Sequence, residues 1–294
     1  MRILVLGGEG MLGHKMYQVL RARFDHVACT VRGRREDEFY REIGLFQNGN
    51  LVEGLDATQT SGVREILEEQ RPDVMVNCIG IIKQRDEAKQ PIPSIALNAL
   101  LPHLLADVCR PWRGRLIHFS TDCVFSGKQG SYTEGDPPDA EDLYGRTKSL
   151  GEVTCGNALT LRTSMIGREL QCFQSLLEWF LGQEHTTVRG FTRAVYSGLT
   201  TNQLADVVTM LIRHYPSLSG LYHVVGEAIS KHDLLCLVRD VYGLDIEIVP
   251  DDSVICDRSM VGDSFCRATD YVSPAWPDLV AQMAADPTPY DEWR

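Results

Sequence analysis

The sequence predicts an α/β protein: a Rossmann-type doubly wound parallel sheet with a smaller mixed α/β substrate lobe. Two observations predict it. Short apolar runs alternate with helical segments from residue 1 to about 166, which is typical of a parallel sheet. The first run, Arg2 to Leu6, leads into Gly7-Gly8-Glu9-Gly10-Met11-Leu12-Gly13 and then into a helix expected from Met11 to Arg23. A dinucleotide-binding turn requires this order of strand, G-x-x-G-x-x-G loop and helix.

The glycines of this loop allow a tight turn and let the backbone approach a pyrophosphate at the positive end of the following helix. The residues expected to bind a dinucleotide here are Gly7, Gly10, Met11, Leu12 and Gly13, with the amides of Met11 and Leu12 facing the phosphates. Glu9 is expected to point to solvent, because an acid is unfavourable so close to a diphosphate. A glycine-rich turn without a ligand is the alternative, and the strand-loop-helix order favours the nucleotide site.

The second expected strand, His26 to Val31, ends at three arginines, Arg32, Arg34 and Arg35. NAD-preferring folds carry an acid at about this distance from the glycines, where it binds the ribose 2′-hydroxyl. Arg32 stands there instead and can pair with a 2′-phosphate, so NADPH is the expected cofactor and NADH the alternative donor. A solvated basic turn would give the same pattern.

Two further strands carry expected cofactor contacts at their carboxyl ends. A strand from Leu51 to Leu55 is followed by Asp56 and Ala57, which are expected near the adenine. The strand Val74 to Gly80 ends in Cys78, Ile79 and Gly80, against which the cofactor is expected to lie. The other elements expected in this half are helices at Thr60–Gln70 and Pro93–Cys109, the second carrying Asn98 inward, and a charged loop at Lys83–Lys89.

The stretch from Leu116 to Glu152 contains the residues expected to perform the chemistry. An apolar run, Leu116 to Phe119, breaks at Ser120-Thr121-Asp122, and a polar loop then leads to a helix between Asp139 and Glu152. On this helix Tyr144 and Lys148 are four residues apart and share a face. No other lysine in the chain follows a tyrosine at this spacing.

An ammonium close to a phenol favours the phenolate, so Lys148 is expected to lower the pKa of Tyr144 from about 10. Such a tyrosine can donate a proton to a developing alkoxide, while the Thr121 hydroxyl at the strand end can hydrogen-bond the same oxygen. Thr121, Tyr144 and Lys148 are therefore the expected catalytic residues, and the last two are also expected cofactor contacts. A surface Tyr-Lys pair without function is the alternative.

Residues 1–166 are the expected NAD(P)-binding domain and residues 167–294 the substrate-binding lobe. The lobe is expected to interleave with the first part and to cover the carboxyl ends of its strands. After a strand at Ala158–Leu161, the elements expected are helices at Phe173–Leu181, Asn202–His214 and Lys231–Tyr242 and strands at Thr187–Arg189, Leu221–Val225 and Ile246–Val249.

Composition and charge limit the partners. The chain has 294 residues and a net charge of −11, which argues against nucleic acid, because such binding needs a concentrated basic surface. The nine cysteines form no C-x-x-C pair and the eight histidines show no ligand spacing, so no metal site is indicated. The first apolar run is too short for a signal peptide, and no later run approaches the length of a membrane span. A cytoplasmic protein without a membrane partner is expected.

Four ordered motifs resemble the extended short-chain dehydrogenase/reductases and, within them, the dTDP-4-dehydrorhamnose reductase (RmlD-like) group. They are Gly7-x-x-Gly10-x-x-Gly13, Ser120-Thr121-Asp122-x-Val124-Phe125-x-Gly127, Tyr144-Gly145-x-Thr147-Lys148-x-x-Gly151-Glu152 and Leu161-Arg162-Thr163-Ser164. The stretches Gly220 to Gly226 and Asp257-Arg258-Ser259 also look like that group. The likeness covers essentially the whole chain.

The resemblance implies a reductase that transfers hydride from the nicotinamide to the C4 keto group of a nucleotide-linked 6-deoxy sugar. It implies that Thr121 orients the carbonyl, Tyr144 donates the proton and Lys148 holds the ribose. The residues implied to bind substrate are Thr121, Asp122, Met165 and, for the diphosphate, Arg258, for which a surface arginine is the alternative. The segment Cys256 to Trp276 is expected to close over the substrate rather than form an element of its own. Departures from the family pattern at Cys123, Met165 and Cys78-Ile79 leave the particular sugar open.

Two other functions remain open. One is a sugar-nucleotide epimerase or dehydratase of the same superfamily. Dehydratases carry an acidic pair near the catalytic threonine, so Cys123 after Asp122 counts against dehydration. The other is a non-catalytic regulatory subunit that keeps the nucleotide site, against which the retained Thr121, Tyr144 and Lys148 count. The oligomeric state is also open, and the sequence is compatible with a homodimer.

Overall fold

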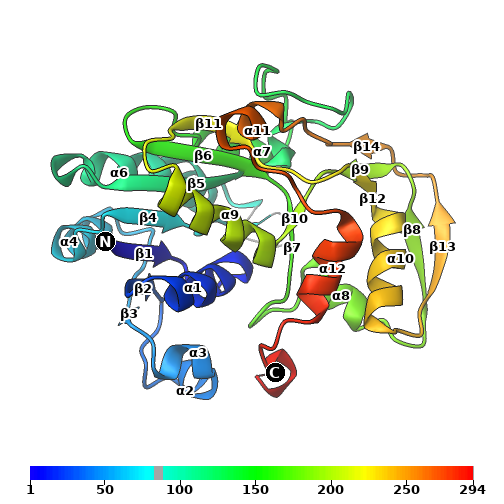
Figure 1. The fold of residues 1–294 in the computed structure, drawn as a ribbon, viewed down its shortest axis with the longest axis horizontal. Helices are drawn as coiled ribbons and strands as arrows, with labels where there is room; N and C mark the ends of the chain where they lie inside the picture. Colours follow the sequence, from blue (N-terminus) through cyan, green and yellow to red (C-terminus); the bar gives the residue numbers. More distant parts are fainter. Residues whose placement is uncertain (83–88, 294) are drawn as a thin grey trace.

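The computed structural model describes residues 1–82 and 89–293 and is built on a seven-stranded sheet (Figure 1). The strand order is β11-β6-β5-β4-β1-β2-β3, and every neighbouring pair is parallel. The strands are β1 (Arg2–Leu6), β2 (His26–Thr30), β3 (Leu51–Val52), β4 (Val74–Asn77), β5 (Arg115–Thr121), β6 (Ala158–Thr163) and β11 (Gly220–His223). The predicted doubly wound sheet is confirmed. The loop expected at Lys83–Lys89 lies, except for its last residue, outside the described residues.

Burial explains why the central strands read as continuous apolar runs. Strands β4, β5 and β6 are buried along their whole length, as in parallel sheets that helices cover on both faces. Each of these strands ends in a polar residue, Asn77 in β4, Thr121 in β5 and Thr163 in β6, although β5 and β6 also bury polar residues before their ends. Thr121 and Thr163 are direct neighbours in the β5–β6 register. The carboxyl edge of the sheet is therefore the edge where chemistry can occur.

Helices cover both faces of the sheet (Figure 1). Helix α1 (Met11–Arg23) packs against α9 (Thr201–His214), and α4 (Thr60–Gln70) packs against α6 (Leu101–Val108). Alternate residues of β1 separate into two buried clusters, Ile3 and Val5 with the first helix pair and Leu4 and Leu6 with the second. Each pair therefore covers its own face of the sheet.

Successive strands are added to one side of β1 as far as β3 and to the other side from β4 onwards, so the strand order reverses between β1 and β4. From β1 the chain winds through β2 and β3 to one edge, and then it returns to β4, β5 and β6 on the other side. Ligands of doubly wound sheets bind in the crevice outside this reversal, at the carboxyl ends of the strands. The glycine loop follows β1 and Thr121 ends β5, so both lie at that edge.

One helical run is longer and more apolar than the sequence indicated. The elements α5 (Pro91–Ser94), η2 (Ile95–Leu100, a π-helical stretch) and α6 follow one another without a break, and only Cys109 separates α6 from η3 (Arg110–Trp112). Pro91–Trp112 has 22 residues and is apolar enough to span a bilayer by length and composition. The expectation that no run approaches that length is therefore wrong. Half of its most apolar window is buried inside the protein, as in a core helix.

The lobe lies to the right of the main sheet in Figure 1, where the sheet strands end. It contains three small sheets, β10-β7, β12-β9-β14 and β13-β8. The strands of these sheets are β7 (Met165–Ile166), which lies just before the predicted start of the lobe, and β8 (Thr187–Phe191), β9 (Ala194–Tyr196), β10 (Leu199–Thr200), β12 (Ile229–Ser230), β13 (Glu247–Asp251) and β14 (Cys256–Asp257). The helices of the lobe are α8 (Leu176–Leu181), α10 (Lys231–Tyr242), α12 (Trp276–Ala284) and η5 (Tyr290–Glu292), whereas α11 (Asp263–Thr269) packs against β11 of the main sheet. Strand β11 and helix α9, from the second half of the chain, return to the main sheet.

The remaining short elements are α2 (Glu38–Glu42), α3 (Gly44–Gln47), η4 (Asp122–Val124) and α7 (Leu143–Leu150). The helix expected from Asp139 begins only at Leu143, because Asp142 is its N-cap and accepts a 2.8 Å hydrogen bond from the Gly145 amide. The segment Cys256 to Trp276 was not expected to form an element, yet it contains β14 and α11. Phe265 and Trp276 anchor it in the core, an interaction that no local pattern reveals.

The C-terminal segment is fastened to α1 by a buried ion pair. Lys15 Nζ lies 2.6 Å from Asp286 Oδ2, and the two side chains are 2% and 9% exposed. The same ammonium donates to Thr288 Oγ1, and the His14 ring contacts the Tyr290 hydroxyl at 2.8 Å. The helix that follows the glycine loop is thus tied to the last residues of the chain.

Candidate functional site

The glycine loop between β1 and α1 has the close packing that its spacing predicts. Gly7 has a φ of +82°, and a Cβ on Gly13 would lie 1.9 Å from the Gly7 carbonyl oxygen. Gly10 is the N-cap of α1, with no side chain capping it and no acid in the first helical turn. The amides of Met11 and Leu12 therefore face no carboxylate of that turn and fit a phosphate.

Glu9 is buried, and the expectation that it points to solvent is wrong. It is 7% exposed, and its carboxylate accepts hydrogen bonds from the Arg32 amide and the Tyr40 hydroxyl. Arg32 Nε lies 3.0 Å from its second oxygen. These partners compensate the cost of burying a carboxylate. The guanidinium expected to meet a 2′-phosphate is already shared with an acid, although 66% of the Arg32 side chain remains exposed.

The other residues expected around the adenosine differ in whether their side chains are already engaged by groups of the protein. Asp56 is exposed, and hydrogen bonds from Thr58 lower its pKa, with a smaller contribution from the charge of Arg32. Asp56, with Ala57 beside it, therefore lies near Arg32 at one edge of the sheet. Arg35 is occupied, because its guanidinium donates to the carbonyl oxygens of Phe46, Gln47 and Gly49. Arg32 is the arginine of this group that lies next to the glycine loop.

The residues after β4 lie beside the glycine loop. The Cys78 amide donates to the Leu6 carbonyl at 3.0 Å, and a Cβ on Gly7 would lie 2.9 Å from Ile79 Cγ1. Asn98 of η2, which is buried, holds the following segment by accepting from the Ile81 amide and donating to the Ile81 carbonyl. Cys78 and Ile79 therefore lie directly beside the glycine loop, and Gly80 follows them in the chain.

Thr121 brings a buried hydroxyl to the end of β5. Its Oγ1 donates to Asp122 Oδ1 at 3.0 Å and accepts from the Cys123 amide at 3.1 Å. The second bond caps the short helix η4, which turns the chain away from the sheet. Both Thr121 and Asp122 are less than a tenth exposed.

Tyr144 lies in the first turn of α7 with its phenol next to Thr121. Burial raises the pKa of this phenol and the neighbouring Cys123 adds to the effect, whereas a hydrogen bond with Thr121 acts in the opposite direction. The pKa lies above its ordinary value, so the expectation that Lys148 lowers it is wrong for the protein alone. Desolvation of the phenolate is the largest effect on this pKa. Tyr144 is therefore held in its protonated form.

Lys148 is buried and donates a 2.6 Å hydrogen bond to the carbonyl oxygen of Phe119 on β5. Burial lowers the pKa of its ammonium to about 8, and the carboxylate of Glu152 opposes this shift. A Cβ on Gly80 would lie 3.9 Å from the same nitrogen. Thr121, Tyr144 and Lys148 thus gather around the ends of β4 and β5.

Two expected substrate residues lie beyond the sheet. Met165 begins β7, two positions after Thr163, which neighbours Thr121 in the sheet. Arg258 follows β14, and its Nε donates to the Phe125 carbonyl at 2.9 Å. Arg258 lines a hollow of about 300 Å³ whose other residues are Cys123, Phe125, Ser126, Lys128, Ala140, Glu141 and Asp142. The arginine therefore faces a concavity next to the catalytic strand.

Near the site the structure shows further residues to which the sequence analysis assigned no role. Glu152 and Arg162 form a buried ion pair at 2.7 Å, and the Ser120 hydroxyl donates to the same carboxylate. This pair explains why both residues belong to the recognised motifs, because it locks the end of α7 to β6. Lys231 and Tyr196 approach Asp122 from the lobe. No local signal marks them, since their neighbours in space are distant in sequence.

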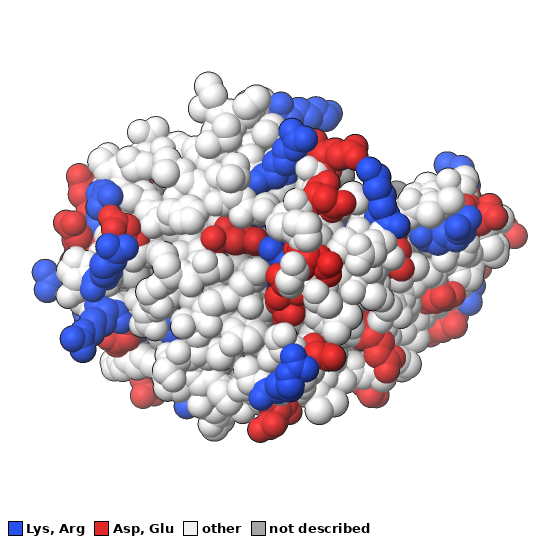
Figure 2. Space-filling view, turned by 90° about the horizontal axis from the view of Figure 1, so that it is seen from above, with Lys and Arg blue, Asp and Glu red and all other residues white. Residues whose placement is uncertain are grey.

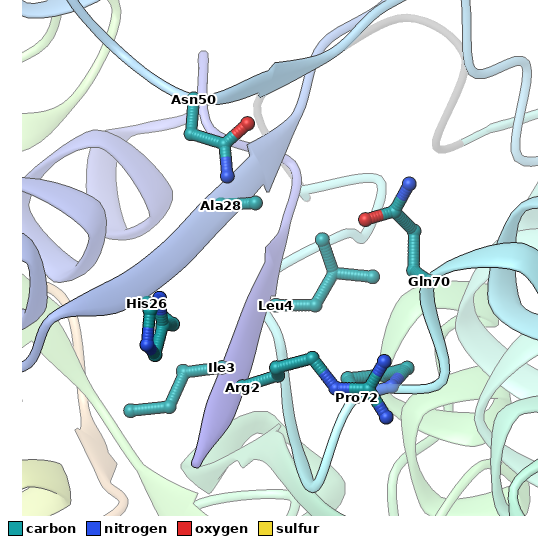
Figure 3. Close-up of a pocket in the computed structure, with 8 residues that line it drawn as sticks. All are labelled: Arg2, Ile3, Leu4, His26, Ala28, Asn50, Gln70 and Pro72. Atoms are coloured by element: carbon teal, nitrogen blue, oxygen red, sulfur yellow. The ribbon is translucent and has the colours of Figure 1, made fainter.

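A second hollow, of about 180 Å³, lies at the opposite end of the sheet (Figure 3). Its lining residues are Arg2, Ile3, Leu4, His26, Ala28, Asn50, Gln70 and Pro72. Arg2 and His26 are the first residues of β1 and β2, so this hollow lies at the amino ends of the strands. It is separate from the glycine loop and from Thr121.

Charged side chains do not gather into a basic surface on the face shown in Figure 2. Lysines and arginines there are interspersed with aspartates and glutamates. This face offers no continuous positive track for a nucleic acid backbone.

Comparison with known proteins identifies the family. The sequence model of the RmlD substrate binding domain matches residues 1–254. The chain belongs to the RmlD substrate binding domain family. The resemblance seen in the motifs is thereby confirmed.

Curated relatives of this RmlD-family chain carry different names. It is 31% identical over 239 residues to the probable dTDP-4,6-dihydroxy-2-methyloxan-3-one 4-ketoreductase of Streptomyces antibioticus, covering 77% of this chain and 72% of the relative. It is 26% identical over 311 residues to the dTDP-4-dehydrorhamnose reductase of Salmonella typhimurium, covering 97% and 98%. It is also 26% identical over 259 residues to methionine adenosyltransferase 2 subunit beta of Danio rerio, covering 83% and 74%.

Solved structures share the fold of this RmlD-family chain. The dTDP-4-dehydrorhamnose reductase of Yersinia enterocolitica matches with a TM-score of 0.77 at 21% identity, over 96% of this chain and 98% of that one. The dTDP-4-dehydrorhamnose reductase of Bacillus anthracis, solved in complex with NADP, matches with a TM-score of 0.75 at 18% identity, over 96% and 98%. These likenesses establish the Rossmann-type architecture.

Proposed function

We propose that this chain is an NADPH-dependent reductase of the 4-keto group of a nucleotide-linked 6-deoxy sugar, with NADH as the alternative donor. The observation that carries the proposal is that the hydroxyl of Thr121, at the end of β5, and the phenol of Tyr144, in the first turn of α7, lie next to each other at the edge of the sheet that also carries the glycine loop. The family supplies the substrate class, because the relatives from Streptomyces antibioticus and Salmonella typhimurium are both named as reductases of dTDP-linked compounds.

The catalytic proposal assigns one role to each residue. Reduction of a ketone places negative charge on its oxygen, and two hydroxyl groups, those of Thr121 and Tyr144, are positioned to receive it. Tyr144 donates the proton, and its raised pKa keeps that proton in place until the charge develops. NADPH, when bound, supplies the hydride. Lys148 holds the ribose and, through the Phe119 carbonyl, fastens α7 to β5.

The residues of the crevice fit a dinucleotide. The uncapped start of α1 suits a diphosphate, and the exposed side of Arg32 suits a 2′-phosphate. A protein of the same fold from Bacillus anthracis is solved with NADP. The proposed cofactor contacts are Gly7, Gly10, Met11, Leu12, Gly13, Arg32, Asp56, Ala57, Cys78, Ile79, Gly80, Tyr144 and Lys148.

The substrate side of the proposal comprises Thr121, Asp122, Met165 and Arg258. It divides the chain after residue 166 into an NAD(P)-binding domain and a substrate lobe, and Cys256 to Trp276 closes over the sugar nucleotide. Truncation before Cys256 is not a suitable test, because Phe265 and Trp276 are buried in the core. Arg258→Ala is suitable, since it should raise the substrate KM and leave the fold intact.

A non-catalytic regulatory subunit is the second candidate. The observation that favours it is the likeness to methionine adenosyltransferase 2 subunit beta over 83% of this chain. Against it stands the retained constellation of Thr121, Tyr144 and Lys148. An epimerase or dehydratase differs from a reductase in consuming no reduced cofactor over the whole cycle.

Turnover of purified protein against a panel of 4-keto-6-deoxy sugar nucleotides separates these candidates. The reductase proposal expects one NADPH consumed for each hydroxyl formed, measured by absorbance together with NMR of the product. A changed sugar without consumption of NADPH would indicate an epimerase or dehydratase. No turnover, with NADPH still bound, would indicate the regulatory subunit.

The proposal also includes a cytoplasmic homodimer. Ile92, Ile95, Leu100 and Leu150 are 83%, 47%, 52% and 67% exposed, and they come from α5, η2 and α7, which pack against one another. A second copy related by a two-fold axis would cover this apolar face. Light scattering should give twice the chain mass of 32.9 kDa, and Leu150→Glu should shift it towards one chain. A monomeric parent, or a parent in the membrane fraction, would contradict this part.

A further inference from the structure

The small sheet β12-β9-β14 brings three lobe residues together. Ile229 of β12 pairs with Tyr196 of β9, so Lys231, two positions later, begins α10 beside that strand. On the other side of β9 the Arg258 amide donates to the Val195 carbonyl at 2.9 Å. Lys231 and Arg258 therefore flank Tyr196 from two segments that are far apart in sequence.

The ammonium of Lys231 lies over the ring of an aromatic residue. Its Nζ lies 3.7 Å from the centroid of the Tyr196 ring. Within residues 1–82 and 89–293, no hydrogen bond or ion pair involves this nitrogen. A cation–π contact is a weak attraction and does not replace an anion. The Tyr196 side chain is 3% exposed, and its hydroxyl also has no hydrogen-bond partner in the described chain.

These unpartnered groups face the catalytic end of β5. Burial lowers the pKa of Lys231, and Asp122 gives the largest opposing contribution, followed by Cys123 and Cys256, while Arg258 lowers it further. Burial also raises the pKa of Tyr196, and the charge of Asp122 adds to it. Asp122 itself accepts a hydrogen bond from Thr121. Lys231 and Tyr196 thus lie near Asp122, the residue that follows the proposed catalytic Thr121.

The local charge differs from that of the whole chain. Near Asp122 two cations, Lys231 and Arg258, meet two carboxylates, because Asp142 also acts on Arg258; this neighbourhood is therefore less negative than the chain as a whole, which carries −11. Lys231 is half-buried, and a cation removed from water without a paired anion is costly unless a ligand supplies that anion. A diphosphate carries its charge in one compact group and can accept from both cations at once. The two cations together therefore fit a nucleoside diphosphate.

We propose that Lys231 is a substrate-binding residue whose ammonium, seated on the Tyr196 ring, binds the diphosphate of a nucleotide-linked sugar together with Arg258. This inference deepens the proposed function and rests on its substrate class. The glycine loop takes the diphosphate of the cofactor, so the two diphosphates occupy separate sites.

Equilibrium binding tests the assignment without turnover. Protein saturated with NADP⁺ is titrated calorimetrically with dTDP, UDP, GDP and inorganic pyrophosphate. Lys231→Met should weaken the best nucleoside diphosphate by about one to two orders of magnitude, the range for loss of a charge-assisted contact. Lys231→Arg should retain most of the affinity. Affinity for NADP⁺ and the melting temperature should stay close to those of the parent.

Arg239→Met is the matched control. It removes a positive charge from the same helix, but Arg239 pairs with Asp240 and lies two turns further along α10. It should leave nucleoside diphosphate binding unchanged. A loss equal to that of Lys231→Met would mean that net charge, and not contact, sets the affinity, and would overturn the assignment.

The outcomes separate the two proposals. Lys231-dependent binding of a nucleoside diphosphate by a parent that reduces no sugar nucleotide would reject the reductase function and keep the binding site. Reduction of a sugar nucleotide with an unchanged KM in Lys231→Met would reject the role of Lys231 alone. A parent that binds none of the four probes would also overturn it. If Lys231→Met unfolds, Lys231→Gln provides the same comparison.

Discussion

The ammonium of Lys148 donates a 2.6 Å hydrogen bond to the carbonyl oxygen of Phe119. This bond joins α7, which carries Tyr144, to β5, which ends in Thr121. Lys148 therefore fixes the position of Tyr144 relative to Thr121. Because the ammonium is buried, this arrangement has a free-energy cost that depends on pH.

Tyr144→Phe should lower turnover by at least about a hundredfold, the lower end of what a positioned acid contributes. The phenyl ring keeps its packing, so the fold and NADPH affinity should survive. Steady-state kinetics with a reducible sugar nucleotide, together with NADPH fluorescence titration, measures both. A variant as active as the parent would show that the proton comes from another group.

Lys148→Met should reduce turnover and NADPH affinity together, because the residue is proposed to hold the ribose as well as α7. The same variant tests the pKa of about 8, which lies below the ordinary value of 10.5. Between these two values the folded protein binds fewer protons than the unfolded chain, so the stability of the parent should rise with pH across that window. The cost is fully present below pH 8 and amounts to about 3 kcal/mol, at about 1.4 kcal/mol for each pKa unit.

Urea unfolding of the parent and of Lys148→Met at pH 7 and pH 10 checks this dependence. The parent should gain stability relative to the variant at the higher pH. Identical pH dependence of the two proteins would mean that Lys148 titrates normally in the folded state.

Arg32→Ala should weaken NADPH far more than NADH. A charge-assisted phosphate contact is worth about 1.5–3 kcal/mol, or one to two orders of magnitude in affinity. The smaller value is expected here, because Glu9 already shares the guanidinium. Arg34→Ala, which removes an exposed neighbouring charge, is the control. Equal losses for both cofactors in Arg32→Ala would rule out contact with the 2′-phosphate.

Asp286→Asn should destabilise the protein by about 3–5 kcal/mol, because it leaves the buried Lys15 ammonium without its counter-ion. Burial raises the pKa of Asp286, but the hydrogen bond and charge of Lys15 and the hydrogen bond of Thr288 lower it to about 2. This stabilisation is present above the ordinary value of 3.8 and is lost as pH falls through 2. Chemical denaturation at pH 7 measures the loss, with the exposed Asp240→Asn as control. A loss of stability no larger than that of the control would contradict the stabilising role of the Lys15–Asp286 ion pair.

Tertiary structure corrected two expectations about charged groups. Glu9 was expected in solvent, but Arg32 and Tyr40, which lie 23 and 31 residues away in sequence, enclose it. Tyr144 was expected to have a lowered pKa from its spacing to Lys148, but burial dominates and raises it. Spacing along a helix places two side chains on one face, whereas desolvation depends on everything that packs around them.

The sequence by itself determined the parts of this protein that depend on local order. The strand, loop and helix around Gly7 to Gly13, the strand end at Thr121 and the position of Tyr144 and Lys148 one helical turn apart on α7 all follow from spacing and periodicity. Only the tertiary structure decided which side chains from distant segments meet. It placed Lys231 on Tyr196 opposite Asp122, and Asp286 on Lys15, because contacts between distant segments depend on how the lobe packs against the sheet. No local pattern in the sequence records that packing.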